Sequence, residues 1–274
     1  NISDPVFEHV VISDNLGTTD LTGSSSGGGM LLFRSDCVIR NSLIMHNQST
    51  KSGSAIELNN SNLLIENTII KNNKLDGNIK NGCISSNNDV NNDPIVLNML
   101  NVVLTNNDGV GVYCSNQINF SAFNSVFHNH DAGIYLGYES SCLLVNSMVI
   151  QNRISGITFK GTGFSIFNNI FWENNNNHLI ADTADPNFGI LISENRNNNA
   201  TDIYYNLFQN PLVKSYVNFE LSNSSPCIEA GTNDFVESER DILGNYRIAD
   251  GDGDGFYHVD IGATEYDALD RIII

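Results

Sequence analysis

Short apolar runs bounded by asparagines recur along the chain. Each copy reads Asn, two or three apolar residues, a polar residue and a second Asn, and weaker copies occupy residues 9–15 and 205–210. The clear copies are Asn41–Asn47, Asn67–Asn73, Asn101–Asn107, Asn124–Asn129, Asn146–Asn152 and Asn168–Asn174. From Asn101 onward their starting points lie 23, 22 and 22 residues apart. Such a fixed period indicates a repeat architecture.

Two further strand-like runs accompany each copy. One precedes it and alternates apolar and polar residues, as in FSAFN and FSIFN, and the other begins near a glycine, as in GVYC and GIYL. Three short strands in about 22 residues leave no room for crossover helices between parallel strands. The pattern therefore predicts an all-β fold, a right-handed parallel β-helix, in which each strand pairs with its counterpart one coil along at about 4.8 Å.

The recurring residues have expected physical roles in such a coil. Stacked asparagines can form a ladder of side-chain amide hydrogen bonds, in which we place Asn124, and glycines supply backbone freedom at the corners. We expect about seven or eight coils over residues 1–210. Two polar insertions are predicted to form loops: residues 74–93, around a strand at Gly82, and residues 174–200, around a strand at Gly189. The sequence opens inside a coil, so we expect earlier coils or a cap upstream.

Charge and composition narrow the possible partners. The 13 Lys and Arg residues against 31 Asp and Glu residues give a net charge of -18, which repels phosphate backbones and anionic lipids. We therefore expect no nucleic-acid partner. No apolar run approaches the length of a membrane span, so membrane insertion is not expected either. Five cysteines without metal-ligand spacing leave at least one thiol unpaired, and four lie in apolar strand-like runs.

The repeat stops at Pro211, and residues 211–274 form a different, C-terminal region. Its phrases are Ser225-Pro-Cys-Ile-Glu-Ala-Gly231, then Asp241-x-x-Gly-Asn-Tyr-Arg247, then Val259-Asp-Ile-Gly-Ala-Thr-Glu-Tyr266. Together with the coils, these phrases resemble bacterial secreted β-helix proteins of the pectin-lyase-like type. The resemblance implies secretion, a place on the bacterial cell surface and further domains of the same longer polypeptide. It implies no single activity, since the fold carries lyases, hydrolases and non-catalytic adhesins.

The C-terminal region is expected to act as a cap, with ion pairs among Asp241, Arg247 and Glu265 that fold it over the last coil. Within it, Asp250, Asp252 and Asp254 alternate as in the first half of a calcium loop. An EF-hand would place a bidentate acid where Ile261 stands, and Asp260 falls one residue short. A calcium site formed by Asp250, Asp252, Asp254 and Asp260 is one hypothesis, and a solvated acidic turn is the other.

A carbohydrate surface is predicted on the glycine-led strands. If alternate residues face outward, one column contains Leu31, Glu57, Ser85, Tyr113, Tyr135, Thr158 and Leu191. Tyr113 and Tyr135 then lie on adjacent coils, where with Glu57 they form a candidate platform for a polysaccharide or cell-surface glycan. The alternative is that the tyrosines only stabilise neighbouring strands.

Catalytic candidates are sparse. Glu139, Arg153 and Lys160, on neighbouring coils, are the best local group for proton abstraction beside a carboxylate, and scattered surface charges are the alternative. The clustered motifs of polygalacturonase-like enzymes and pectate lyases do not occur in the sequence. The sequence therefore favours a non-catalytic extracellular module, structural, adhesive or glycan-binding. A lyase or hydrolase acting on an acidic polysaccharide is the alternative.

Overall fold

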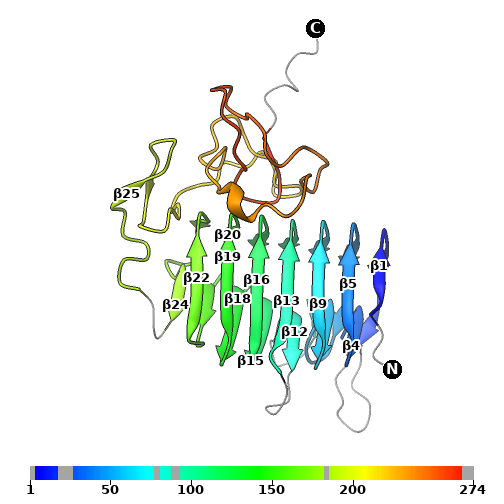
Figure 1. Cartoon of the computed structure of the whole chain (residues 1–274). Coiled ribbons are helices and arrows are strands. Elements are labelled where there is room, and N and C mark those ends of the chain that lie inside the picture. The colour runs from blue at the N-terminus through cyan, green and yellow to red at the C-terminus, as the bar shows by residue number, and fades with distance from the viewer. Residues whose placement is uncertain (1–3, 18–26, 77–80, 88–92, 182–184, 267–274) are drawn as a thin grey trace.

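Three parallel sheets wind into a right-handed β-solenoid of about six turns (Figure 1). The structure, a computed structural model, describes residues 4–17, 27–76, 81–87, 93–181 and 185–266. Every strand of these sheets pairs in parallel with its counterparts on adjacent coils, as in Phe120 with Leu97 and Cys142. The predicted all-β parallel β-helix is confirmed. The seven strands of each sheet span these turns and match the lower end of the expected seven or eight coils, whereas residues 185–210 add only one parallel bridge, Ile170 with Leu207.

The three sheets contain seven strands each. The first sheet consists of β1 (Val6–Glu8), β5 (Asp36–Arg40), β9 (Asn62–Glu66), β13 (Ile95–Leu100), β16 (Ile118–Phe123), β19 (Ser141–Val145) and β22 (Gly163–Phe167). The second consists of β2 (Val11–Ser13), β6 (Leu43–Met45), β10 (Ile69–Lys71), β14 (Val103–Thr105), β17 (Val126–His128), β20 (Met148–Ile150) and β23 (Ile170–Trp172). The third consists of β4 (Met30–Phe33), β8 (Ile56–Asn59), β12 (Gly82–Asn87), β15 (Val110–Asn116), β18 (Ala132–Tyr138), β21 (Ser155–Phe159) and β24 (Leu179–Ala181).

Short elements complete the described residues. They are the three-stranded sheet of β3 (Leu16–Gly17), β7 (Gln48–Ser49) and β11 (Lys74–Leu75), the antiparallel pair β25 (Ser193–Glu194) and β26 (Ala200–Thr201), and the 3-10 turn Asn233–Phe235. The structure describes no helix long and apolar enough to cross a membrane. All five cysteines are free and buried.

Most bends of a coil in the described residues use one residue with positive φ followed by a buried residue. The bend between the first and second sheets begins at the first Asn of the repeated phrase, for example Asn124 with φ 48°. Asn adopts this left-handed conformation more readily than most residues, which explains its recurrence. The next residue links coils, as when the backbone N–H of Ser125 donates to Ser147 Oγ at 3.1 Å.

The amide ladder lies at the other end of the phrase, between the second and third sheets. Asn47 Nδ2 donates to Asn73 Oδ1 at 3.0 Å, and Asn73 Nδ2 donates to Asn107 Oδ1 at 2.9 Å. Asn152 and Asn174 continue it at 2.8 Å, and all five side chains are buried. A buried ladder of asparagines is therefore confirmed. The placement of Asn124 in it is wrong, since Asn124 opens the other bend.

The glycines that begin strands occur where neighbouring coils approach each other closely. They are not needed for a positive φ at a corner. Gly111, Gly133 and Gly156 do not have positive φ. A Cβ on any of them would lie 2.5 to 2.7 Å from a carbonyl oxygen of the next coil. Steric exclusion at the coil-to-coil contact therefore explains why glycine recurs there.

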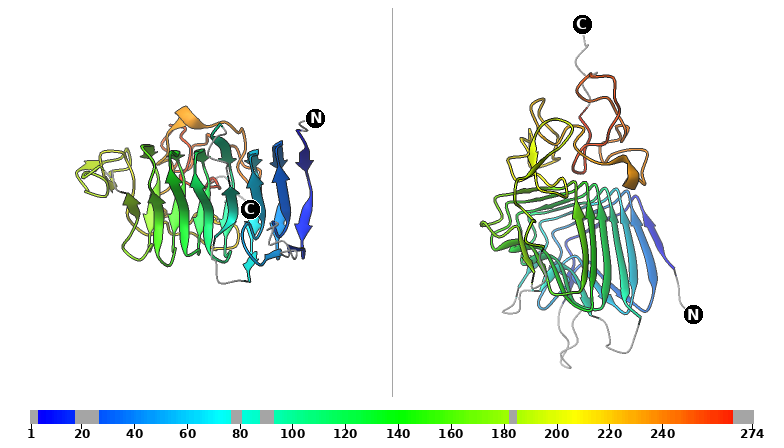
Figure 2. Two further views of the ribbon diagram at one scale, coloured as in Figure 1. Left: turned by 90° about the horizontal axis from the view of Figure 1, so that it is seen from below. Right: turned by 60° about the vertical axis from the view of Figure 1, so that its left-hand side comes forward.

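The C-terminal tail, residues 211–266, packs along one side of the solenoid rather than over its last coil (Figures 1 and 2). Asparagines that open four successive bends donate to its backbone carbonyls: Asn101 to Arg240, Asn124 to Asp260, Asn146 to Thr232 and Asn168 to Ala230. Its apolar residues form a second core with the outer face of the second sheet, including Val126, Met148 and Ile170. The expected cap over the last coil is therefore wrong in position. Residues 267–274 of the predicted cap lie outside the described residues.

The covered strands show this packing in their sequences. In β14, β17 and β20 every residue is buried, whereas the middle residues of β6 and β10 alone are buried. Strands buried on both faces lose the alternation of apolar and polar residues. The end of the rod is covered by other residues, since Phe188 and Phe208 pack against Phe171 with ring centroids 5.4 and 5.6 Å away.

Candidate functional site

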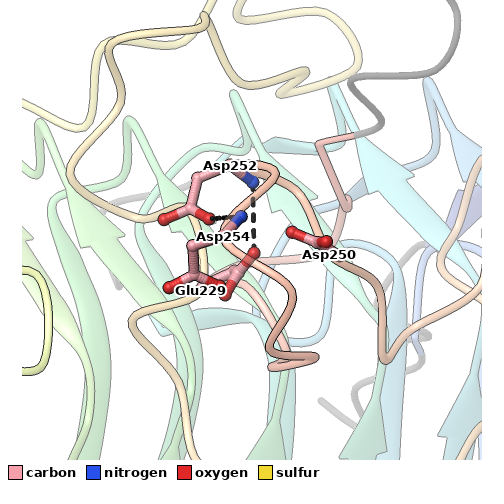
Figure 3. A group of neighbouring side chains, drawn as sticks. All are labelled: Glu229, Asp250, Asp252 and Asp254. Carbon is pink, nitrogen blue, oxygen red and sulfur yellow. Dashed lines mark hydrogen bonds between the residues drawn. The ribbon is translucent and has the colours of Figure 1, made fainter.

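Four carboxylates converge on the tail: Glu229, Asp250, Asp252 and Asp254 (Figure 3). One oxygen from each lies within 4.8 Å of the others. The sequence folds this way because the aspartates cap a glycine-rich turn. Asp250 accepts the backbone N–H groups of Gly253 and Gly255 at 2.7 and 3.1 Å, and both glycines have positive φ. The turn therefore holds three exposed or half-exposed acids beside one buried acid.

Glu229 is the member of this cluster that the sequence did not indicate. Its buried carboxylate accepts the backbone N–H of Asp252 at 3.1 Å, which ties the turn to the rest of the tail. Burial raises the pKa of Glu229. Arg196, from the segment between β25 and β26, lies 3.0 Å from Glu229 and 3.4 Å from Asp254. Its guanidinium supplies part of the positive charge that a bound cation would supply.

Asp260, the fourth predicted calcium ligand, is not a member of this group. Its buried carboxylate accepts the backbone N–H groups of Glu229 and Tyr266, each at 2.6 Å. Desolvation raises the pKa of Asp260 to about 7. Asp260 therefore organises the fold of the tail, and Glu229 lies beside the acidic turn where Asp260 was predicted to lie.

A groove of about 590 Å³ adjoins the carboxylate cluster and shares Asp252 with it. Trp172, the only tryptophan of the chain, forms one wall, and amide side chains form much of the rest: Asn197, Asn199, Gln209, Asn210 and Asn223. Gln209 Nε2 donates to Asn199 Oδ1 at 3.4 Å. Within the described residues, the Gln209 amide oxygen and the Trp172 indole N–H make no hydrogen bond, so both are open to a ligand. One feature of the sequence could have indicated this groove: the tryptophan at the end of a coil strand.

The predicted column on the third sheet is largely confirmed. Tyr113 pairs with Ser85 on one side and with Tyr135 on the other, and Tyr135 pairs with Thr158. The expected Leu191 is wrong, because β24 begins five residues after the ladder residue Asn174 and places Ile180 next to Thr158. For the same reason no strand forms at Gly189.

The tyrosines of this column stack on each other. Their ring centroids are 4.9 Å apart and the planes differ by 13°, so one face of each ring is used inside the protein. Glu57 is buried, and its carboxylate accepts a hydrogen bond from Ser52 Oγ at 2.8 Å. A sugar ring could stack only on the remaining ring faces, above the small side chains of Ser85 and Thr158. The tyrosine pair thus has the geometry of a strand-stabilising stack.

The predicted catalytic residues are not brought together. Arg153 precedes β21 and pairs with Asp131 at 3.0 Å, whereas Lys160 follows β21. The five residues of β21 lie between them, which is about 16 Å at the rise of a strand. Glu139 lies at the same end of the third sheet as Lys160 and accepts Gln117 Nε2 at 2.8 Å. The trio therefore cannot act on one bond.

A scan against family models finds no match, and searches of curated proteins and of solved structures return no similar protein. The parallel β-solenoid is the part of the sequence resemblance that the structure supports.

Proposed function

We propose that the chain is a non-catalytic, glycan-binding module of a larger secreted or cell-surface protein of the pectin-lyase-like type. The groove beside Trp172 carries the proposal. An indole wall can stack on the apolar face of a sugar ring, while planar amides exchange hydrogen bonds with its hydroxyl groups. A few oriented polar groups around an aromatic wall are the usual composition of a small-ligand site.

The charge of the protein bears on the class of glycan. A net charge of -18 and the carboxylates next to the groove repel uronates and sulfates. We therefore propose a neutral or amino-sugar glycan as the ligand. The rod would then present the groove at a fixed distance from neighbouring domains of the polypeptide.

Calcium is the proposed cofactor of the turn formed by Asp250, Asp252 and Asp254, with Glu229 in place of Asp260. Carboxylate oxygens are the ligands that calcium prefers, and at least six oxygens complete its shell. Arg196 would have to leave Glu229 and Asp254 for the ion to bind. Because Asp252 also borders the groove, the ion would stabilise the wall that a sugar contacts.

The test is binding of neutral oligosaccharides, screened on a glycan array and then titrated by calorimetry and by Trp172 fluorescence. Truncating a central aromatic contact typically weakens binding by tenfold or more, so we expect about a tenfold loss in Trp172→Ala. Tyr138→Ala is the matched control. It removes an exposed aromatic residue at the end of β18 in the third sheet, which does not line the groove, and should bind the glycan as the wild type does. Tyr113→Ala tests the surface that the sequence indicated.

Two results would overturn the proposal. The first is unchanged glycan binding in Trp172→Ala with loss in Tyr113→Ala, which would move the site to the third sheet. The second is the appearance of unsaturated uronate ends or new reducing ends on incubation with pectin, alginate or chondroitin, which would make the chain an enzyme.

A further inference from the structure

A second cavity lies at the end of the solenoid, away from the groove. It has a volume of about 240 Å³ and lies between β22, the edge strand of the first sheet, and residues 185–204. Its walls are mainly aromatic: Phe164, Phe167, Phe188 and Tyr204. Each of these side chains is only partly buried, so the cavity opens to solvent.

Among the residues that the structure describes, Asp185 is the only charged one that lines this cavity. Its position is fixed by three hydrogen bonds: Tyr204 Oη donates to Oδ2 at 2.5 Å, and the backbone N–H and the side-chain amide of Asn187 donate to Oδ1 at 2.8 and 2.9 Å. These donors, above all the Tyr204 hydroxyl, lower the pKa of Asp185. The cavity therefore presents one oriented negative charge among aromatic rings.

The chemistry of the walls selects among ligands. A neutral apolar ligand would strip water from the carboxylate without compensating its charge. A small metal ion would lose its hydration shell and find only one carboxylate in return. An organic ammonium ion suits both features, because aromatic rings attract a cation whose substituents are apolar and the carboxylate completes the charge pair.

We infer that the cavity bounded by Phe164, Phe188, Tyr204 and Asp185 binds a small organic ammonium ion of the choline type. The volume admits a trimethylammonium group with a short substituent. The acidic surface of the whole chain attracts such cations and raises their concentration near the cavity. This site is independent of the groove beside Trp172 and of the proposed glycan.

The test is titration of the whole chain with choline and with its neutral isostere 3,3-dimethyl-1-butanol, followed by NMR and calorimetry. Choline should bind at least about tenfold more tightly, because the neutral alcohol lacks the charge that Asp185 and the rings recognise. Comparison of choline with phosphocholine distinguishes a free ammonium compound from a phosphorylated headgroup, since the added phosphate lies near Asp185 and is repelled.

Asp185→Asn should lose choline binding by about tenfold. Its amide oxygen at the Oδ1 position keeps the two hydrogen bonds from Asn187, and its amide N–H donates to Tyr204 Oη in place of the bond that Tyr204 donates to Asp185. Asp36→Asn removes one negative charge from β5, which lies five strands away from β22 in the first sheet, and should bind choline as the wild type does. Phe164→Leu tests the aromatic wall without removing its apolar surface. Equal affinity of wild type for choline and its neutral isostere, absence of binding at millimolar choline, or wild-type affinity in Asp185→Asn would overturn the inference.

Discussion

The rod and the tail of this protein are stabilised in different ways. In the rod, each coil contacts its neighbours through the same three strands, the same apolar core positions and the same ladder residues. In the tail, residues 211–266 contain one 3-10 turn and isolated bridges, and buried charged groups hold them together. The difference shows that a repeated sequence builds stability by stacking, whereas a segment present once needs specific polar contacts.

Arg247 is the centre of those polar contacts. Its side chain is 1% exposed, donates to Glu265 at 2.6 Å and to the carbonyl of Gly262 at 3.0 Å, and also contacts Asn101 of the rod. Asp241 accepts the backbone N–H groups of Leu243, Asn245 and Glu265. The predicted trio Asp241, Arg247 and Glu265 thus meets in one network, in which Arg247 and Glu265 form the ion pair and Asp241 binds backbone amides.

The largest expected effect is loss of this network. Arg247→Met keeps much of the side-chain volume but leaves Glu265 buried without its partner, which costs about 3–5 kcal/mol. The tail should then unfold in denaturant well before the rod. Arg240→Met is the control, since Arg240 packs over the ring of Tyr246 and donates to the Gly244 carbonyl at the surface; it should cost less than about 1 kcal/mol. A single unfolding transition unchanged in Arg247→Met would contradict this role.

The stabilities of the tail and of the rod should change with pH in opposite directions. Desolvation raises the pKa of Asp260 in the tail to about 7, so its contribution to stability is fully present below about pH 4 and is lost as pH rises through 7. The shift from 3.8 to about 7 amounts to up to about 4 kcal/mol, since one pKa unit corresponds to about 1.4 kcal/mol.

In the rod, burial lowers the pKa of His130 to about 4. Its contribution is present above about pH 6.5 and is lost as pH falls towards 4, because the folded rod favours the neutral ring. Melting followed separately in tail and rod between pH 4 and 8 checks both signs. Parallel pH profiles for the two regions would show that they do not respond through these groups. Asp260→Asn should reduce the pH dependence of the tail alone, and Glu229 and Glu265, whose pKa values burial also raises, should keep the rest of it.

A smaller effect is expected from the amide ladder of the rod. Asn152→Ala removes the acceptor of the buried His130 backbone N–H and the amide that donates to Asn174 Oδ1 and to the Phe127 carbonyl, and should cost about 1–3 kcal/mol. Asn124→Gly is the contrasting variant, because glycine keeps the positive φ while only the hydrogen bond to the tail is lost. Denaturant midpoints decide the comparison, and an Asn124→Gly variant that loses as much stability as Asn152→Ala would refute the assignment of the ladder.

The smallest effect concerns calcium at the acidic turn. At tenfold the dissociation constant, the ion should stabilise the tail by about 1.4 kcal/mol. Arg196→Gln removes the competing guanidinium and should tighten calcium binding while it lowers the stability of the calcium-free tail. Melting curves in chelator, in calcium and in sodium chloride of equal ionic strength provide the measurement. If sodium chloride stabilises as much as calcium, the turn is a solvated acidic loop.

The fold of the rod could be predicted from the sequence more fully than the fold of the tail. The sequence predicts the strand positions, their spacing and the column through Tyr113 and Tyr135. Each of these depends on the alternation of apolar and polar residues and on a repeat period that the sequence shows directly. The two classes of asparagine were not separated, since the phrase contains both and only the backbone conformation of Asn124 distinguishes them. His130 takes the place of a ladder asparagine, and so the copy ending at Asn129 was one residue short.

The tail was predictable only as a distinct segment. Its side-on position depends on contacts between residues more than a hundred positions apart, such as Arg247 with Asn101, which no local pattern encodes. Glu229 joins the acidic turn through a contact with Asp252, 23 positions further along the chain, which no local pattern encodes either. The groove beside Trp172 forms between the last coils and the tail, so its amide residues come together only after the tail has docked.

Hydrogen exchange of Arg247→Met beside the wild type tests most directly whether the tail is a separately stabilised cover on the side of the rod. The amides of residues 211–266 should lose protection in the variant, while those of β5 to β21 keep wild-type protection. Equal loss of protection in the coils and in the tail would contradict the account, since rod and tail would then form one cooperative unit.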